Sequence, residues 1–95
     1  MPKNFYALIY EVVDNFLVRR APLRESHLGL VRAAHERGEL LMAGSFQDPP
    51  DGALLVFRVE DEAEVAEFAR ADPYVIEGLV TAWRVHHWHN VLASD

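Results

Sequence analysis

The chain has 95 residues, of which 51% are hydrophobic and 25% are charged, and this length and composition predict one globular domain over residues 1–95. Nine Lys and Arg against fifteen Asp and Glu give a formal net charge of −6, which argues against nucleic-acid binding because that affinity depends on clustered cations. The absence of Cys excludes disulfides, a thiol nucleophile and thiolate metal ligands. Neither a signal-peptide pattern nor an apolar run of membrane-spanning length is found, so we expect a cytoplasmic protein that does not bind membranes.

The first half of the chain has the pattern of a strand, a helix and a second strand. Residues 5–13 are apolar except for Glu11 and rich in aromatic and β-branched residues, which predicts a strand. Residues 22–37 have helical periodicity, and Gly38 follows where a helix stop is expected. Residues 40–46 are predicted to form the second strand. The side chains expected on the buried face of the helix are Leu23, His27, Leu30, Val31 and Ala34.

The second half repeats this order after a turn at residues 47–52, which are rich in Pro, Asp and Gly. Its predicted elements are a third strand, a second helix and a last strand, over residues 53–59, 60–71 and 80–88. Asp61 and Glu64 have the spacing of a capping box at the start of the helix. The helix is expected to end at Asp72, because the following Pro73 disfavours the helical conformation there.

Two successive β-α-β units predict an α+β fold, the ferredoxin-like βαββαβ sandwich, with a four-stranded antiparallel sheet and both helices on one face. The uncovered face of such a sheet usually alternates to polar residues. Here, however, both faces of the strands over residues 5–13 and 53–59 are apolar. Two helices can cover only one face, so we expect a homodimer packed through the other sheet face, in the manner of a dimeric α/β barrel.

His27 and Asp72 are the candidates for catalytic residues. His27 lies on the apolar face of the first helix, and Asp72 continues the inward face of the second helix at three residues after Ala69. Because both helices lie on the same face of the sheet, the two side chains can meet as a dyad, in which the carboxylate fixes the imidazole tautomer and raises its basicity. The pattern also allows a buried histidine bonded to a backbone carbonyl and an aspartate that merely ends a helix.

Arg24 lies one turn before His27 and is therefore its neighbour on the helix surface. Its guanidinium group can anchor a carboxylate or phosphate of a small ligand, as can a backbone amide near Gly44. The alternative is a solvated cation. We expect no bound cofactor, because the glycines do not form a phosphate-binding loop. Neither Ser26 nor Ser45 lies in a nucleophile elbow, so acyl-enzyme chemistry is not indicated.

A histidine-rich segment, His86-His87-Trp88-His89, ends the last predicted strand. Alternate residues of a strand share a face, so His87 and His89 would point the same way and His86 the opposite way. Two histidines can hold a metal ion only with a third ligand, and no acidic residue or histidine is spaced to supply it. We therefore predict no metal site and interpret the segment as a polar strand end; metal binding by these histidines is the weaker alternative.

Several motifs together resemble the YciI-like family: Arg24-Glu-Ser-His27-Leu28, the segment from Gly38 to Gly44, Ala71-Asp72-Pro73-Tyr74, and Gly78. The resemblance extends over nearly the whole chain. It implies a ferredoxin-like fold that forms a dimeric α/β barrel, and an active site built on a histidine and an aspartate at the positions of His27 and Asp72. We expect Tyr74, within the third motif, to contact the substrate.

These observations lead to two hypotheses. The first is a small cofactor-free enzyme in which His27 is the general acid or base and Asp72 orients it. It would act by proton transfer, isomerisation or elimination on a small anionic molecule. No nucleophile for a covalent mechanism is evident. The second is a non-catalytic, dimeric ligand-binding or accessory domain, in which the same hydrogen bond is structural.

Overall fold

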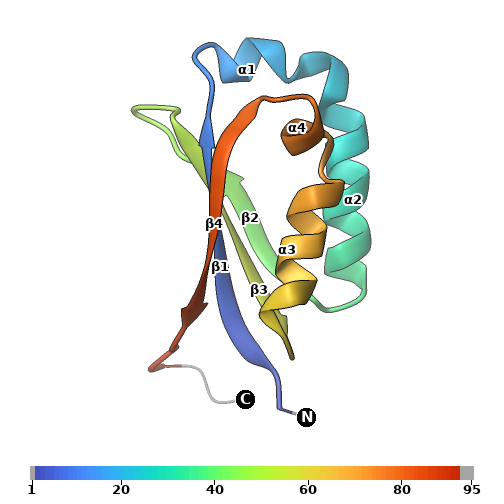
Figure 1. Cartoon of the computed structure of the whole chain (residues 1–95), viewed down its shortest axis with the longest axis vertical. Coiled ribbons are helices and arrows are strands. Elements are labelled where there is room, and N and C mark those ends of the chain that lie inside the picture. Colours follow the sequence, from blue (N-terminus) through green and yellow to red (C-terminus); the bar gives the residue numbers. More distant parts are fainter. Residues whose placement is uncertain (1, 93–95) are drawn as a thin grey trace.

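A computed structural model describes residues 2–92 and consists of a four-stranded antiparallel sheet with its helices packed against one face (Figure 1). The strands are β1 (Asn4–Val12), β2 (Leu40–Ser45), β3 (Gly52–Val59) and β4 (Val80–Trp88). They lie in the order β2-β3-β1-β4, with β1 and β3 in the centre. The α+β fold and the ferredoxin-like βαββαβ order predicted from the sequence are therefore confirmed.

The two main helices are α2 (Arg24–Glu36) and α3 (Glu62–Ala71), which lie side by side on the sheet. Three short helical segments that we did not predict accompany them: α1 (Phe16–Arg19), the 3-10 helix η1 (Ala21–Leu23) and α4 (Pro73–Ile76). They lack the two or more turns over which hydrophobic periodicity becomes recognisable in a sequence. None of the helices in the described range has the length and hydropathy required to cross a membrane.

The ends of the main helices follow from local sequence chemistry. Gly38 has φ +79° and follows α2, and its N–H bonds the carbonyl of His35 while the next N–H, of Glu39, bonds that of Ala34. This is the Schellman arrangement, which glycine adopts without steric cost. At the start of α3, the predicted capping box is present: Asp61 accepts from Ala63 N–H, and Glu64 accepts from Asp61 N–H.

The hydrophobic core lies between the sheet and the helices. Alternate residues of each strand point toward the helices, and the register places Tyr6, Leu8 and Tyr10 of β1 opposite Phe57, Leu55 and Ala53 of β3. Val65, Phe68 and Ala69 of α3 close this core from the helix side. Tyr10 therefore lies in the protein interior, beneath the helices.

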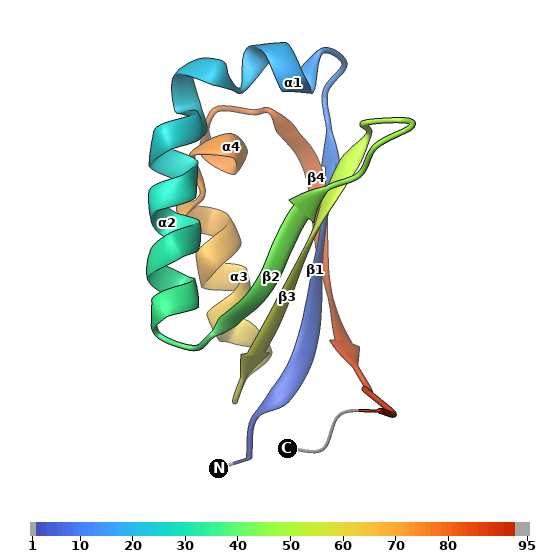
Figure 2. The same ribbon diagram turned by 180° about the vertical axis from the view of Figure 1, so that it is seen from behind.

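The other face of the sheet is covered by no helix (Figure 2). On the two central strands it is mainly apolar, as predicted: Phe5 and Ile9 of β1 and Leu54 of β3 lie on it, whereas β4 adds Arg84 and His86 to the same face. On its outer strands, the side chain of Met42 is 67% exposed and that of Trp88 is 47% exposed. Large exposed hydrophobic side chains grouped on one face are a feature of interaction surfaces.

Candidate active site

Asp72 lies at the junction of two helices and is fully buried, with a relative exposure of 0%. Its extended backbone (φ −71°, ψ 123°) ends α3 and begins α4, and Pro73 occupies the first position of the new helix. The carboxylate Oδ1 accepts the backbone N–H of Tyr74 at 3.0 Å, so Asp72 is the N-cap of α4. The Asp-Pro pair therefore both ends a helix and turns its carboxylate into the protein interior.

Two further donors meet the same carboxylate. Tyr10 Oη donates to Asp72 Oδ2 at 2.8 Å, and His27 Nδ1 lies 2.9 Å from Asp72 Oδ1. A buried carboxylate is costly unless hydrogen bonds replace its hydration, and these three donors do so. Burial, reinforced by the neighbouring Asp72 charge, raises the pKa of Tyr10 far above its ordinary value. The Tyr10 hydroxyl therefore stays protonated and serves as a permanent donor.

The His27 ring is held in a defined orientation. It stacks on the ring of Tyr74, with centroids 3.9 Å apart and an interplanar angle of 11°, and Phe16 meets Tyr74 edge-on at 5.3 Å. Because an ionised carboxylate only accepts hydrogen bonds, the proton between His27 and Asp72 is assigned to Nδ1. In the neutral imidazole this leaves the lone pair on Nε2. The side chain is 14% exposed, and Nε2 makes no hydrogen bond with any residue in the range 2–92.

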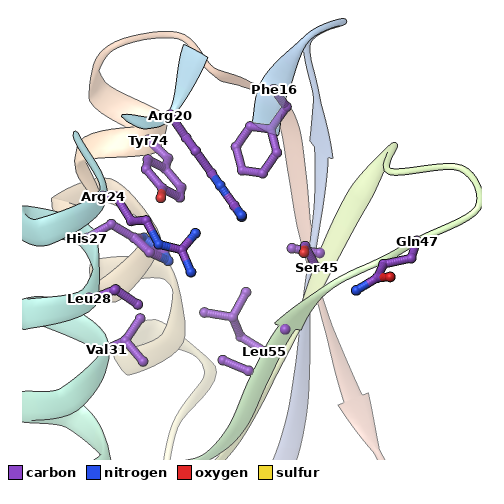
Figure 3. A pocket seen from close by; sticks show the side chains of 13 residues that line it. Phe16, Arg20, Arg24, His27, Leu28, Val31, Ser45, Gln47, Leu55 and Tyr74 are labelled. Atoms are coloured by element: carbon purple, nitrogen blue, oxygen red, sulfur yellow. The ribbon is translucent and has the colours of Figure 1, made fainter. Parts of the chain in front are cut away.

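His27 lines a cavity of about 340 Å³ between α2 and the edge of the sheet (Figure 3). One wall comes from α1, α2 and the residues between them, the opposite wall from β2 and β3, and Tyr74 contributes from α4. The lining combines apolar side chains with polar and cationic ones. The residues that line it are Phe16, Arg20, Arg24, His27, Leu28, Val31, Ala43, Gly44, Ser45, Gln47, Ala53, Leu55 and Tyr74.

Two arginines reach into this cavity from the helical wall (Figure 3). Arg24 is the first residue of α2, and Arg20 follows α1, with its guanidinium carbon 5.5 Å from the centre of the Phe16 ring. Burial raises the pKa of Tyr74, while the charges of Arg20 and Arg24 act in the opposite direction. The cavity therefore combines a histidine with two permanent positive charges.

The residues proposed from the sequence are found together. His27, Arg24, Gly44 and Tyr74 line the cavity, while Asp72 lies behind His27 and does not line it. Gly44 pairs with Leu54, so its Cβ position is on the uncovered sheet face, and only its backbone borders the cavity. The site residues missed by the sequence analysis are Tyr10, Phe16, Arg20, Ser45 and Gln47.

The spacing of Phe16, Arg20 and Arg24 was a signal for two of the missed residues. Three positions four apart continue the helical stripe that leads to His27. From the sequence, the first helix is predicted to start at Pro22. In the structure, α1 and η1 precede α2, and Pro22 lies in the first turn of η1, where proline is tolerated. Tyr10 gave no such signal, since its bond to Asp72 spans 62 residues of sequence.

The histidine-rich segment lies away from this cavity. His87, on the helix side of β4, packs against Tyr6 with ring centroids 5.2 Å apart, and His86, on the other face, accepts from Arg84 Nε at 3.2 Å. His89 lies beyond the end of β4. Within residues 2–92, no three His, Cys, Asp or Glu side chains are grouped so that they could hold a metal ion.

Among solved structures, the chain is similar to the 5-chloro-2-hydroxyhydroquinone dehydrochlorinase TftG from Burkholderia phenoliruptrix AC1100, in complex with 2,5-dihydroxybenzoquinone. The TM-score is 0.75 at 19% identity, covering 90% of this chain and 93% of that chain, which shows a shared fold. A comparison with curated proteins found no significant match. The YCII-related domain matches residues 4–89, and the chain therefore belongs to the YCII-related domain family.

Proposed function

We propose that this protein is a small acid–base enzyme in which His27 Nε2 exchanges protons with a small anionic substrate and Asp72 orients the imidazole. The observation that carries the proposal is the 2.9 Å contact between His27 Nδ1 and Asp72 Oδ1, made by a histidine that lines a cavity. The contact assigns the proton to Nδ1 and leaves a lone pair on Nε2 for a ligand. A carboxylate–imidazole pair of this kind is suited to general acid–base catalysis.

In the proposed reaction, Nε2 takes a proton from a carbon or oxygen of the substrate, and the Asp72 carboxylate stabilises the imidazolium that forms. In one course, the electron pair left on the substrate forms a double bond while a leaving group departs with its bonding pair. In the other, the electron pair moves within the molecule and the proton returns at another atom. The first course is an elimination and the second an isomerisation. Arg24 binds the anionic group and fixes the substrate relative to His27.

The similarity to TftG supports the first of these courses. Its name describes a dehydrochlorinase, an enzyme that removes the elements of HCl from its substrate, and its structure was determined with a hydroxylated quinone. Removing HCl requires a base for the proton and a way for chloride to leave. The acid–base chemistry proposed for His27 is of the same class, on a fold of the same kind.

Hydrogen exchange in heavy water tests this proposal and does not require the natural substrate. A panel of small carboxylates and hydroxyquinones, including 2,5-dihydroxybenzoquinone, is incubated with the protein in D₂O and followed by proton NMR. We expect protein-dependent loss of a carbon-bound proton signal from at least one compound, and loss of that exchange in His27→Asn. Exchange that continues at the wild-type rate in His27→Asn would contradict the proposed role.

A second candidate function is a non-catalytic ligand-binding domain in which the pair is structural. One observation favours it: Asp72 is fully buried and holds together β1, α2 and α4 through Tyr10, His27 and Tyr74. This bonding makes Asp72 important for folding under either function, so its stability effect does not discriminate between them. His27 does, because only the enzymatic function requires Nε2.

We further propose that the uncovered sheet face binds a second copy of the chain. The proposal is supported by the exposed side chains of Met42 and Trp88 on that face, since burying apolar surface between identical faces of a twofold dimer removes it from water. Sedimentation at micromolar concentration tests it, with the mass of a dimer expected and the mass of a monomer contradicting it.

A further inference from the structure

Arg20 and Arg24 enter the cavity as a pair. The backbone at both residues is right-handed helical, with φ −72° and ψ −16° at Arg20 and φ −60° and ψ −43° at Arg24, and η1 connects them. In a 3-10 helix residues three apart share a face, so the pairing of these two arginines rests on where their side chains lie and not on their spacing. Figure 3 shows both guanidinium groups extending from this wall into the same cavity.

Their positive charges are not balanced by the protein. In the part of the chain that the structure describes, neither Arg20 nor Arg24 forms an ion pair with an acidic side chain, and no Asp or Glu lines the cavity. The nearby Asp72 carboxylate already accepts three hydrogen bonds and lies behind His27. The cavity is thus locally cationic in a chain whose net charge is −6, and the two like charges repel each other there.

We infer that Arg20 and Arg24 together select a ligand with two acidic groups, a small dianion with a hydrocarbon body. This ligand class is the substrate class of the proposed enzyme. The inference rests on the proposed function only in assuming that the bound ligand reacts at His27 Nε2. One acidic group balances one guanidinium, and the second balances the charge that a monoanion would leave uncompensated. Leu28, Val31 and Leu55 provide the apolar surface for the ligand body.

Matched pairs of ligands that differ by one charge test this inference. Isophthalate and succinate are dianions, and their half-amides, 3-carbamoylbenzoate and succinamate, have nearly the same shape with one charge fewer. Binding is measured by calorimetry at low ionic strength, where screening is weak. For at least one pair, we expect wild-type protein to bind the dianion roughly 10- to 100-fold more tightly than its half-amide, the range for a hydrogen bond to a charged group.

The arginine variants identify the residues responsible. In Arg20→Gln, the preference for the dianion should fall by roughly the same 10- to 100-fold while the half-amide still binds through Arg24. Arg20→Lys should retain part of the preference because it keeps the charge and loses the planar fork. Arg19→Gln is the matched control, since Arg19 is exposed and does not line the cavity, and it should bind as wild type does.

The outcome is independent of catalysis. His27→Asn keeps both arginines and should keep the dianion preference, so a failed exchange experiment together with an intact preference would reject the proposed reaction and retain this inference. Absence of a preference for the dianion in both pairs, including absence of binding, would overturn the inference. So would an Arg20→Gln protein with an unchanged preference.

Discussion

The imidazole of His27 lies parallel to the phenol ring of Tyr74, with their centroids 3.9 Å apart. The backbone N–H of Tyr74 also bonds Asp72 Oδ1, the oxygen that His27 Nδ1 contacts. A single short segment, Asp72-Pro73-Tyr74, therefore restrains the histidine in two directions, in the ring plane by a hydrogen bond and perpendicular to it by stacking. An imidazole restrained in this way presents Nε2 at a constant position in the cavity, as the proposed role of His27 as a base would require.

His27→Asn separates the structural role of the histidine from its chemical role. The asparagine amide nitrogen can take the place of Nδ1 and donate to Asp72, but nothing replaces Nε2. We expect the free energy of unfolding to stay within about 1 kcal/mol of wild type, and any proton-exchange activity to fall about 10²–10⁴-fold. Urea unfolding and the exchange assay measure the two effects.

His35→Asn is the matched control for this variant, because His35 lies on the same helix outside the cavity, with Nδ1 at 2.8 Å from the carbonyl of Leu40. It should keep full activity. A non-catalytic domain would instead show no activity for His27→Asn to lose, with ligand binding unaffected by the substitution.

Asp72→Ala should be strongly destabilising, because it leaves Tyr10, His27 and Tyr74 without their shared acceptor inside the protein. Each buried donor that is left without an acceptor costs about 1–3 kcal/mol. Asp72→Asn keeps one acceptor oxygen and should cost about 1–3 kcal/mol. Urea unfolding provides the comparison, with Asp51→Ala at an exposed position as the control. A loss for Asp72→Ala no greater than that for Asp51→Ala would show that the three bonds contribute nothing.

Tyr10 should make the folded state sensitive to alkaline pH. Its pKa is raised in the folded protein above the ordinary value of 10.0, so the unfolded chain loses this proton first as the pH increases. The stabilising contribution is complete below pH 10 and declines above it, by about 1.4 kcal/mol per pH unit. Tyr10→Phe should be less stable than wild type at neutral pH and should show a shallower alkaline decline. Parallel pH curves for the two proteins would contradict this.

Met42→Glu should dissociate the proposed dimer, because Met42 is 67% exposed on the uncovered sheet face and a charge buried there would lack a partner. We expect wild-type protein to sediment with the mass of a dimer and the variant with that of a monomer. Val18→Glu introduces the same charge at an apolar residue on α1 that is 75% exposed, and it should remain dimeric. Equal masses for all three proteins would contradict an interface at Met42.

The fold was predictable because its signals are local. Apolar runs rich in aromatic and β-branched residues indicate the strands, and helical periodicity indicates the two main helices. Capping residues such as Asp61 and Gly38 mark where the helices begin and end. The elements that were missed, α1, η1 and α4, have three or four residues each. Their stability depends on packing of Phe16 and Tyr74 against each other and against the core, which is tertiary information.

The candidate site was only partly predictable. Helical phase places His27 inward, and Asp72 follows from the continuation of α3, but the third donor to the carboxylate, Tyr10, comes from a strand 62 residues away. Alternation in β1 shows only that Tyr10 and Tyr6 lie on the same face of the strand. Which of the two hydroxyls meets Asp72 depends on the positions of β1 and α4 relative to each other, and no local pattern encodes that distance.

The most direct measurement of the central claim is the position of the proton on His27. Long-range proton–nitrogen correlation NMR on ¹⁵N-labelled protein distinguishes the two nitrogens of a neutral imidazole. We predict a protonated Nδ1, bonded to Asp72, and an unprotonated Nε2 whose nitrogen shift changes when a ligand enters the cavity. A neutral ring that carries its proton on Nε2 would contradict the proposed mechanism, because that nitrogen would then have no lone pair with which to accept a proton.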